Sequence, residues 1–355
     1  MLNYLDCDSV ASRNEVPELR VLPFEMAREV WQRLVDSSPA AGLHHDQRWL
    51  TLLSRTYRLP IWIAALEHDG TTSAACVFAR SGRPFAKRFV SLPFSDSCPP
   101  LTRSQQAGDD LLEAISFDPR FRAGCEIRGI DPGPPWDTAE CFAEWMLDLN
   151  RPLKTVERGY HENFRRNMRR AAGFGVKIEH GRDRQYIERF FAMQLETRRR
   201  HGIPPQPFRL FTNMLDIFDD NALEIWIASH NKRDISAAIL LRFRDRLYYR
   251  WGARRADSPH GINQLLFGTI IQEFAGKVAA LDLGRTDVRN QGLTRFKREL
   301  GASAKPLPYA FLPKAPQNVS AEVMSGSRKL ASQIWSHLPL AATRMIGAAV
   351  YGYLA

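Results

Sequence analysis

Apolar and polar positions along the chain predict an order of secondary-structure elements that occurs twice. Between residues 17 and 130 the periodicity predicts a short strand, two amphipathic helices, a hairpin closed by Asp-Gly, a third strand, a helix and a last strand. Residues 175–284 repeat this β-α-α-β-β-β-α-β order with similar internal distances. The tetrapeptide Ile-Trp-Ile-Ala, at 61–64 and 225–228, falls in the first hairpin strand of each copy. The sequence therefore predicts an internal duplication.

Each copy is expected to form a mixed, mostly antiparallel sheet with a crossover helix, which places the chain in the α/β (α+β) class. Between the copies, residues 142–149 are expected to finish the first sheet, and 162–173 to form a basic helix that stops at Gly173. The first copy is expected to have helices at 24–35, 48–57 and 108–117 and strands at 17–22, 61–67, 72–80, 87–94 and 125–130. The second copy is expected to have helices at 186–200, 208–218 and 261–276 and strands at 175–181, 223–230, 235–243, 246–253 and 278–284.

Length and composition are those of a folded protein with more than one domain. Because 355 residues exceed one small core, we expect a first domain over 1–150, a second over 151–312 and a tail over 313–355. A hydrophobic content of 44% with 25% charged residues argues against wholesale disorder. The five cysteines are scattered and never spaced Cys-x-x-Cys, which argues against a zinc site or a disulfide framework and favours a reducing cytoplasm. Residues 1–20 contain acidic side chains and no apolar run, so they do not have the pattern of a secretory signal.

The positive charge of the chain is concentrated in one segment. The formal net charge is +10, and residues 151–255 hold 23 Lys and Arg against 12 Asp and Glu, so the rest of the chain nearly balances. A local positive field predicts an anionic partner, such as nucleic acid, a phosphorylated cofactor, a nucleotide-linked substrate or an acidic membrane. A solvated helix surface with internal salt bridges is the alternative interpretation.

Three motifs resemble a known family. They are SLPFSDSCPPL at 91–101, HENFRRNMRRAAGFGVKI at 161–178 and LDLGRTDVRNQGLTRFKRELGA at 281–302. Together with the duplication, they resemble the GNAT acyltransferase fold in tandem, and within it the Fem-type branch, whose better-known members add amino acids to peptidoglycan precursors from aminoacyl-tRNA. The resemblance covers roughly residues 17–312. It implies two tandem GNAT-like domains and an acyltransferase, but it does not fix the donor.

Two residues are the candidates for catalysis. Lys297 matches the lysine of the family's Phe-Lys segment, which implies a place beside the reacting carbonyl, where an ammonium would stabilise the oxyanion. The preceding residue, Phe296, is a candidate for substrate binding. Asp96 is the candidate general base for the incoming amine. The alternatives are a surface lysine on a helix and a loop aspartate that caps its own backbone.

Substrate-binding candidates lie in the basic segment. Tyr249 and Trp251 are expected on one face of a strand, with Arg250 on the other, and Tyr249 or Arg250 is expected in a substrate groove, with core packing as the alternative. Four arginines form two adjacent rows on one helix face, where guanidinium groups would bind paired phosphates: Arg165, Arg166, Arg169 and Arg170.

The phosphate-binding turn of coenzyme-A-dependent GNAT enzymes is reduced here to Gly261 and the nearby Arg255. This departure from the family pattern weakens acetyl-CoA as the donor and leaves aminoacyl-tRNA or another carrier more open. Neither donor would be a tightly bound cofactor, and no metal is implied.

The tail has apolar residues at near-helical steps, including Leu330, Ile334 and Met345, and is expected to be helical. Arg344 and Pro339 argue against a membrane span. Two interpretations remain open for it, an interfacial helix at a membrane and a helix packed on the protein itself.

These observations favour a Fem-like N-acyltransferase of a bacterial cytoplasm, with a peripheral place at the inner face of the plasma membrane as the alternative. It would transfer an aminoacyl or acyl group to an amine of a phosphorylated, nucleotide-linked or lipid-linked envelope precursor. An acyl-CoA-dependent N-acyltransferase of envelope or exopolysaccharide synthesis is the second hypothesis. A nucleic-acid-binding protein with degenerate GNAT domains is the third.

Overall fold

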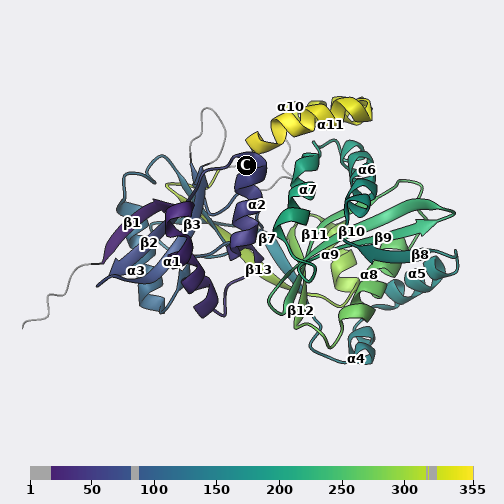
Figure 1. Ribbon diagram of the computed structural model, residues 1–355, viewed down its shortest axis with the longest axis horizontal. Coiled ribbons are helices and arrows are strands. Elements are labelled where there is room, and N and C mark those ends of the chain that lie inside the picture. The colour runs from purple at the N-terminus through teal and green to yellow at the C-terminus, as the bar shows by residue number, and fades with distance from the viewer. Residues whose placement is uncertain (1–16, 81–87, 317–318, 320–325, 355) are drawn as a thin grey trace, which may run out of the picture.

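The duplicated order of elements is present in the computed structural model of the protein (Figure 1), which describes residues 17–80, 88–316, 319 and 326–354. Residues 1–16 of the segment judged not to be a signal lie outside this part. In the first half the elements are β1 (Glu18–Pro23), α1 (Phe24–Ser37), η1 (Leu43–His45), α2 (Gln47–Tyr57), β2 (Ile61–His68), β3 (Thr71–Arg80), β4 (Phe89–Val90), β5 (Leu101–Thr102), α3 (Gln105–Phe117) and β6 (Cys125–Arg128).

The second half follows the same order after two short helices. These are α4 (Leu153–Arg158) and the basic helix α5 (Glu162–Ala172). The repeat itself comprises β8 (Lys177–Gly181), α6 (Arg184–Arg200), α7 (Phe208–Ile217), β9 (Leu223–His230), β10 (Arg233–Phe243), β11 (Arg246–Arg254), α8 (Ile262–Phe274) and β12 (Ala280–Asp287). The remaining elements are β7 (Asp137–Asp148), α9 (Gln291–Glu299), β13 (Ser303–Leu312), α10 (Gly326–His337), α11 (Leu340–Val350) and η2 (Tyr351–Leu354).

One predicted strand is much shorter than expected. The pattern predicted a strand over 87–94, but β4 covers only Phe89–Val90, and residue 87 lies outside the described residues. The strand stops because Leu92 and Phe94 have positive φ values of 65° and 63°. Left-handed backbone at these positions cannot continue a pleated strand. The chain instead forms a loop over residues 91–97, which we call the Asp96 loop.

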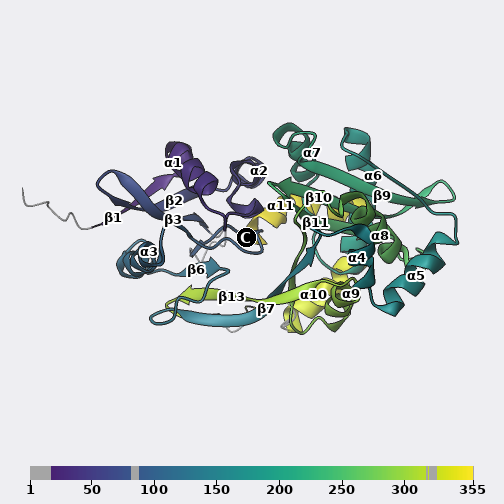
Figure 2. The same cartoon turned by 90° about the horizontal axis from the view of Figure 1, so that it is seen from below.

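The two halves exchange strands at the centre of one sheet. The strand order is β1-β2-β3-β4-β6-β13-β7-β12-β11-β10-β9-β8, with all pairs antiparallel except β4–β6 and β11–β12. The expectation that residues 142–149 finish the first sheet is wrong, because β7 pairs with β12 and β13. Conversely, β13 from the end of the repeat pairs with β6 of the first half. Figure 2 shows β7 and β13 running side by side between the two lobes.

The halves also share a hydrophobic core. Helices α1 and α2 of the first half and α6 and α7 of the second pack on one face of the sheet, and Trp31, Trp49, Phe190 and Phe211 belong to a single buried cluster. Burying such large side chains is the main favourable contribution to folding. Separate clusters lie under α3 and under α8 on the opposite face. The shared core fixes how the halves face each other, and therefore fixes the cavity between them.

The tail is helical, as expected, and α11 packs against α6 of the second half. Thr343 is fully buried in this contact. Packing on the protein is therefore the interpretation that the structure supports. Within the described residues, no helix is both long and apolar enough to cross a membrane.

Candidate active site

A first cavity opens where two parallel strands separate. Strands β11 and β12 pair only from Arg246–Tyr248 to Ala280–Asp282, and beyond that point they diverge. We call the opening, of about 510 Å³, the splay cavity. Helix α8 begins at its wall. Gly261, just before that helix, has φ 89°, and a Cβ there would lie 2.2 Å from the carbonyl oxygen of Asn167. Only glycine fits where α8 meets α5.

Lys297 lines the splay cavity. It lies on α9, which begins where the Asn290 side chain accepts a hydrogen bond from the Leu293 amide at 3.0 Å. Only 2% of Lys297 is exposed, so the interpretation as a surface lysine is wrong. Its Nζ donates to the Gly284 carbonyl at 2.8 Å and to the Arg285 carbonyl at 3.4 Å. Burial lowers the pKa of Lys297 to about 8, although Asp96 and Asp282 act in the opposite direction.

Aromatic rings form the rest of this wall. Phe296 packs against Phe164 and Phe267, with ring centroids 6.4 and 5.5 Å away. Tyr249 meets Phe267 edge to face at 4.9 Å, and burial raises the pKa of Tyr249 to about 12. The hydroxyl of Tyr249 is therefore neutral near pH 7. Phe296 and Tyr249 both line the splay cavity.

The second cavity lies between the halves, and we call it the central cavity. Its volume is also about 510 Å³. Its cationic side carries Arg128, Arg198, Arg250 and Arg285, with Asp96 as the acidic residue of the lining. Its aromatic side carries Trp49, Tyr57, Phe94, Trp251 and Tyr351. A cavity with this surplus of guanidinium groups is suited to an anionic ligand.

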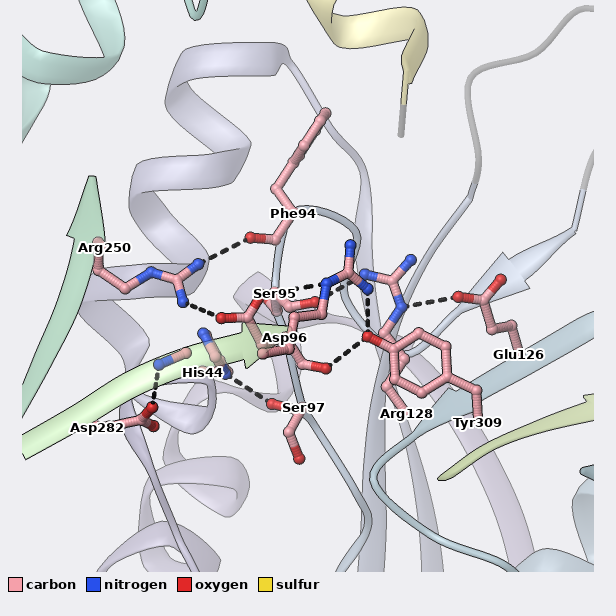
Figure 3. A network of polar contacts seen from close by, with 12 residues as sticks. His44, Phe94, Ser95, Asp96, Ser97, Glu126, Arg128, Arg250, Asp282 and Tyr309 are labelled. Atoms are coloured by element: carbon pink, nitrogen blue, oxygen red, sulfur yellow. Dashed lines mark hydrogen bonds and ion pairs between the residues drawn. The ribbon is translucent and has the colours of Figure 1, made fainter. Parts of the chain in front are cut away.

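Asp96 lines the central cavity and forms ion pairs with two arginines, and Figure 3 labels one of them, Arg250. Its Oδ2 accepts from Arg250 Nη1 at 2.7 Å, and its Oδ1 lies 3.6 Å from Arg285 Nε. Burial by itself raises the pKa of Asp96, but the two guanidinium groups outweigh burial and hold that pKa well below its ordinary value. The alternative of an aspartate that caps its own loop does not describe these contacts. A carboxylate stabilised in this way is also a weak base.

The Asp96 loop is held in its left-handed conformation by several hydrogen bonds. Trp49 Nε1 donates to the Ser95 hydroxyl at 2.8 Å, and Tyr309 donates to the Asp96 carbonyl at 2.7 Å. The His44 ring donates from Nδ1 to the Ser97 carbonyl at 2.7 Å, because a carbonyl can only accept. Bulky residues with positive φ each cost roughly 1–3 kcal/mol and persist where the surroundings over-determine them, as they do at functional sites.

A β-bulge turns the Arg250 side chain toward the first half. Ile239 pairs with Trp251 and Leu240 with Tyr249, so Arg250 is the extra residue in β11. The expectation that Tyr249 and Trp251 share one face is wrong for this reason. Tyr249 packs on the α8 side and Trp251 on the α6–α7 side. Bulges often re-aim side chains beside active sites. Arg250 then lies over the Trp49 ring at 4.9 Å and donates to the Phe94 carbonyl at 3.2 Å.

The arginines of α5 do not act as one set. Arg165 donates to the Glu157 and Arg158 carbonyls, both at 2.9 Å, and so closes the end of α4. Arg166 lines a groove of about 350 Å³ beside the splay cavity, together with Arg295 of α9. Arg169 and Arg170 are exposed at the end of the helix. The expectation of two rows on one phosphate-binding face therefore fails for Arg165.

Arg255 does not reach the splay cavity as a phosphate ligand. Its Nε donates to the Asp234 carbonyl at 2.7 Å, and its Nη1 forms an ion pair with Glu196. Gly261 does line the splay cavity, and its role in binding a cofactor stays a prediction. Among the described residues there is no group of three or more His, Cys, Asp or Glu side chains that would hold a metal ion.

Sequence reasoning missed several residues of this site. Asp282 is 6% exposed, and its Oδ1 accepts from the Gly284 amide at 2.6 Å. Burial, reinforced by the carboxylate of Glu144, raises the pKa of Asp282 to about 7. A carboxylate inside an apolar strand was the signal available for it. Arg128 and Arg285 gave no such signal, because their roles depend on strands that come from different parts of the chain.

With the geometry described, comparison with known proteins identifies the fold. Residues 158–298 match the family described as an acetyltransferase (GNAT) domain. The match lies within the second half of the chain. The resemblance to Fem-type, tandem-GNAT proteins is confirmed, and the match to a GNAT domain supports the expected acyltransferase class.

Individual relatives agree with this assignment. The UDP-N-acetylmuramoylpentapeptide-lysine N(6)-alanyltransferase of Weissella viridescens is 25% identical over 108 residues, which cover 30% of this chain and 32% of that protein. The crystal structure of FemX superimposes with a TM-score of 0.61 at 13% identity, covering 79% of this chain and 95% of that one. The C-terminal domain of a putative lysylphosphatidylglycerol synthetase from Agrobacterium fabrum gives a TM-score of 0.54 at 14% identity, covering 90% and 97%. At these identities the structural matches show the shared fold alone.

Proposed function

We propose that the protein transfers an aminoacyl or acyl group from a donor held in the splay cavity to an amine held in the central cavity. The observation that carries this proposal is that the two cavities adjoin. Thr197, His201 and Gly252 line both of them. A carbonyl in one cavity and an amine in the other can therefore approach each other, and holding two reactants in this way supplies much of the acceleration in acyl transfer.

Lys297 is the residue that we assign to the developing charge. The amine nitrogen forms a bond to the carbonyl carbon, and the bond from that carbon to the oxygen or sulfur of the carrier breaks. The proton of the amine ends on the departing oxygen or sulfur, directly or through water. Lys297 Nζ has three protons and donates to the carbonyls of Gly284 and Arg285, and a fixed ammonium at the cavity wall suits an oxyanion.

Asp96 has a different role in this proposal from the general base expected from sequence. Its ion pair with Arg250 makes it a weak base, so we assign it to hold Arg250 and Arg285 at the wall of the central cavity. Those guanidinium groups would bind an anionic acceptor. The name of the Weissella viridescens relative points in the same direction, because its acceptor is a nucleotide-linked peptide amine. We therefore propose a phosphorylated or nucleotide-linked precursor of the cell envelope as the acceptor.

The surface beside the splay cavity favours a donor with a long anionic carrier. The groove with Arg166 and Arg295 shares His260, Gln264 and Phe296 with the splay cavity. Helices α5 and α9 thus place guanidinium groups next to the splay cavity. These groups would contact the backbone phosphates of an aminoacyl-tRNA. The start of α8 at Gly261 is the observation that favours acyl-CoA instead, since helix N-termini bind phosphate.

Donor profiling tests the proposal. The protein is incubated with a lysine-containing UDP-linked peptide and either charged tRNA or a mixture of acyl-CoA compounds, and mass spectrometry reads which donor is consumed. Lys297→Ala should slow turnover at least 100-fold, whereas Lys277→Ala just after α8, where the side chain is 62% exposed, should not. Full turnover by Lys297→Ala would remove the oxyanion assignment. The result would favour the nucleic-acid-binding hypothesis if neither donor is bound or consumed and the affinity for RNA rises steeply as the salt concentration falls.

A further inference from the structure

The C-terminal segment returns to the central cavity. Helix α11 packs against α6, and a Cβ on Gly347 would lie 2.7 Å from the ring of Pro205, so α11 closely approaches the loop between α6 and α7. The residues after α11 lie beside α2 of the first half (Figure 1), where Tyr351 stacks on Tyr57. The short helix η2 places Tyr351 in the lining of the cavity. A segment beyond the duplicated region thus supplies part of the wall.

Tyr351 completes a group of three half-buried rings. Its ring centroid lies 5.4 Å from Phe94 and 5.9 Å from Tyr57, both stacked at 23°, and Tyr57 lies 4.5 Å from Phe94. Its hydroxyl accepts a hydrogen bond from Arg198 at 3.1 Å, which fixes the ring in place. All three rings line the central cavity. Half-buried rings at a cavity wall offer a flat apolar surface to a ligand.

The aromatic side and the cationic side of the cavity are in contact where Arg250 lies over Trp49 and where Arg198 donates to Tyr351. They also meet at Phe94. Phe94 contributes its ring to the aromatic group, and its carbonyl accepts from Arg250, which also binds Asp96. A ligand that spans both sides needs a planar ring joined to an anionic group. A nucleoside diphosphate has this arrangement, because its base is planar and its phosphates bind guanidinium groups.

We infer that Tyr351 is a specificity-determining residue, which recognises the base of a nucleoside-diphosphate-linked acceptor while the arginines hold the phosphates. This inference rests on the proposed function, in which the central cavity holds the acceptor. It assigns to the C-terminal segment a part in substrate selection. Met345 of α11 is 74% exposed and provides a matched control in the same segment.

Calorimetric titration with UDP and with inorganic pyrophosphate tests the inference on the full chain. Wild type should bind UDP at least tenfold more tightly than pyrophosphate. Tyr351→Ala should weaken UDP binding about tenfold, the effect of removing one aromatic ring, and change pyrophosphate binding less than twofold. Tyr351→Phe keeps the ring and should stay within threefold of wild type for UDP. Met345→Ala should change neither affinity, and thermal unfolding of each variant shows whether it is folded.

The outcomes separate this inference from the function on which it rests. Wild type that binds pyrophosphate as tightly as UDP, or a folded Tyr351→Ala variant with unchanged UDP affinity, would overturn the role of Tyr351 alone. An equal loss for UDP and pyrophosphate would show that the tail only supports the cavity. Wild type that binds neither probe would overturn both the role of Tyr351 and the assignment of the central cavity to an anionic acceptor.

Discussion

Replacing Lys297 by methionine tests whether a charged amine is buried at the proposed oxyanion site. Lys297 is 2% exposed, and its pKa is lowered from 10.5 to about 8, mainly by burial. Below pH 8 both the folded and the unfolded chain carry the proton, and the folded state bears the cost of a buried charge. Between pH 8 and 10.5 the folded chain loses the proton first. The wild type should therefore become more stable, relative to Lys297→Met, as the pH rises through this window.

The size of this effect follows from the two pKa values. At about 1.4 kcal/mol for each pH unit, the difference between 10.5 and about 8 corresponds to roughly 3 kcal/mol in total, of which about 2.5 kcal/mol falls between pH 7 and pH 10. Urea unfolding at these two pH values measures it. The change in packing that the substitution causes cancels between the two measurements, because packing does not depend on pH.

A control separates this effect from the general response of the protein to alkaline pH. Lys277 lies on the surface, with 62% of its side chain exposed, and its ion pair with Glu273 is solvated. Lys277→Met should follow the wild type at both pH values. Parallel curves for wild type and Lys297→Met would refute the reasoning, since they would mean that the Lys297 amine is as well solvated in the folded chain as in the unfolded one.

Three further substitutions test the surrounding site. Gly284→Ala should lower the free energy of unfolding in urea by about 1–2 kcal/mol. The reason is that Gly284 has φ 72° and that a Cβ there would lie 3.1 Å from Asp96 Oδ2. An unchanged free energy of unfolding would contradict that packing. Asp96→Ala leaves the Arg250 side chain, which is 8% exposed, without its carboxylate and should lower the free energy of unfolding by about 3 kcal/mol. Asp216→Ala, in an exposed ion pair, should lower it by less than about 1 kcal/mol. Equal losses would count against the Asp96 network. Arg166→Gln should reduce the slope of log affinity for RNA against log salt by about 1, and an unaltered slope would remove α5 from the RNA surface.

The duplication was predictable from sequence because it depends on local periodicity. Short apolar runs with turn residues between them identify hairpins such as β2–β3, whose turn residues Asp69 and Gly70 have the positive φ that Asp-Gly favours. The strand exchange was not predictable in this way. Only the part of β7 within residues 142–149 was predicted as a strand, and no strand was predicted for β13. The partners of both lie far away in the chain, and only packing selects β12 and β6 for them.

The candidate site was predictable where one motif carries it. Lys297 could be found because the Phe-Lys segment is local, and its place in the splay cavity agrees with that motif. The contacts of Asp96 could not be predicted from sequence. Arg250 is directed toward Asp96 by a β-bulge, and Arg285 lies on β12, which pairs with the exchanged strand β7. Periodicity assigns faces on the assumption of a regular pleat, and one extra residue in β11 reverses the faces after it.

The exchange of β7 and β13 affects how the chain is made. During synthesis the first half leaves the ribosome before β13 has been made. One edge of β6 therefore stays unpaired until β13 emerges. Such an edge can pair with another nascent chain. Neither half is therefore a self-sufficient folding unit, and a gene cut between the copies would yield two fragments that each lack the strand completing their sheet.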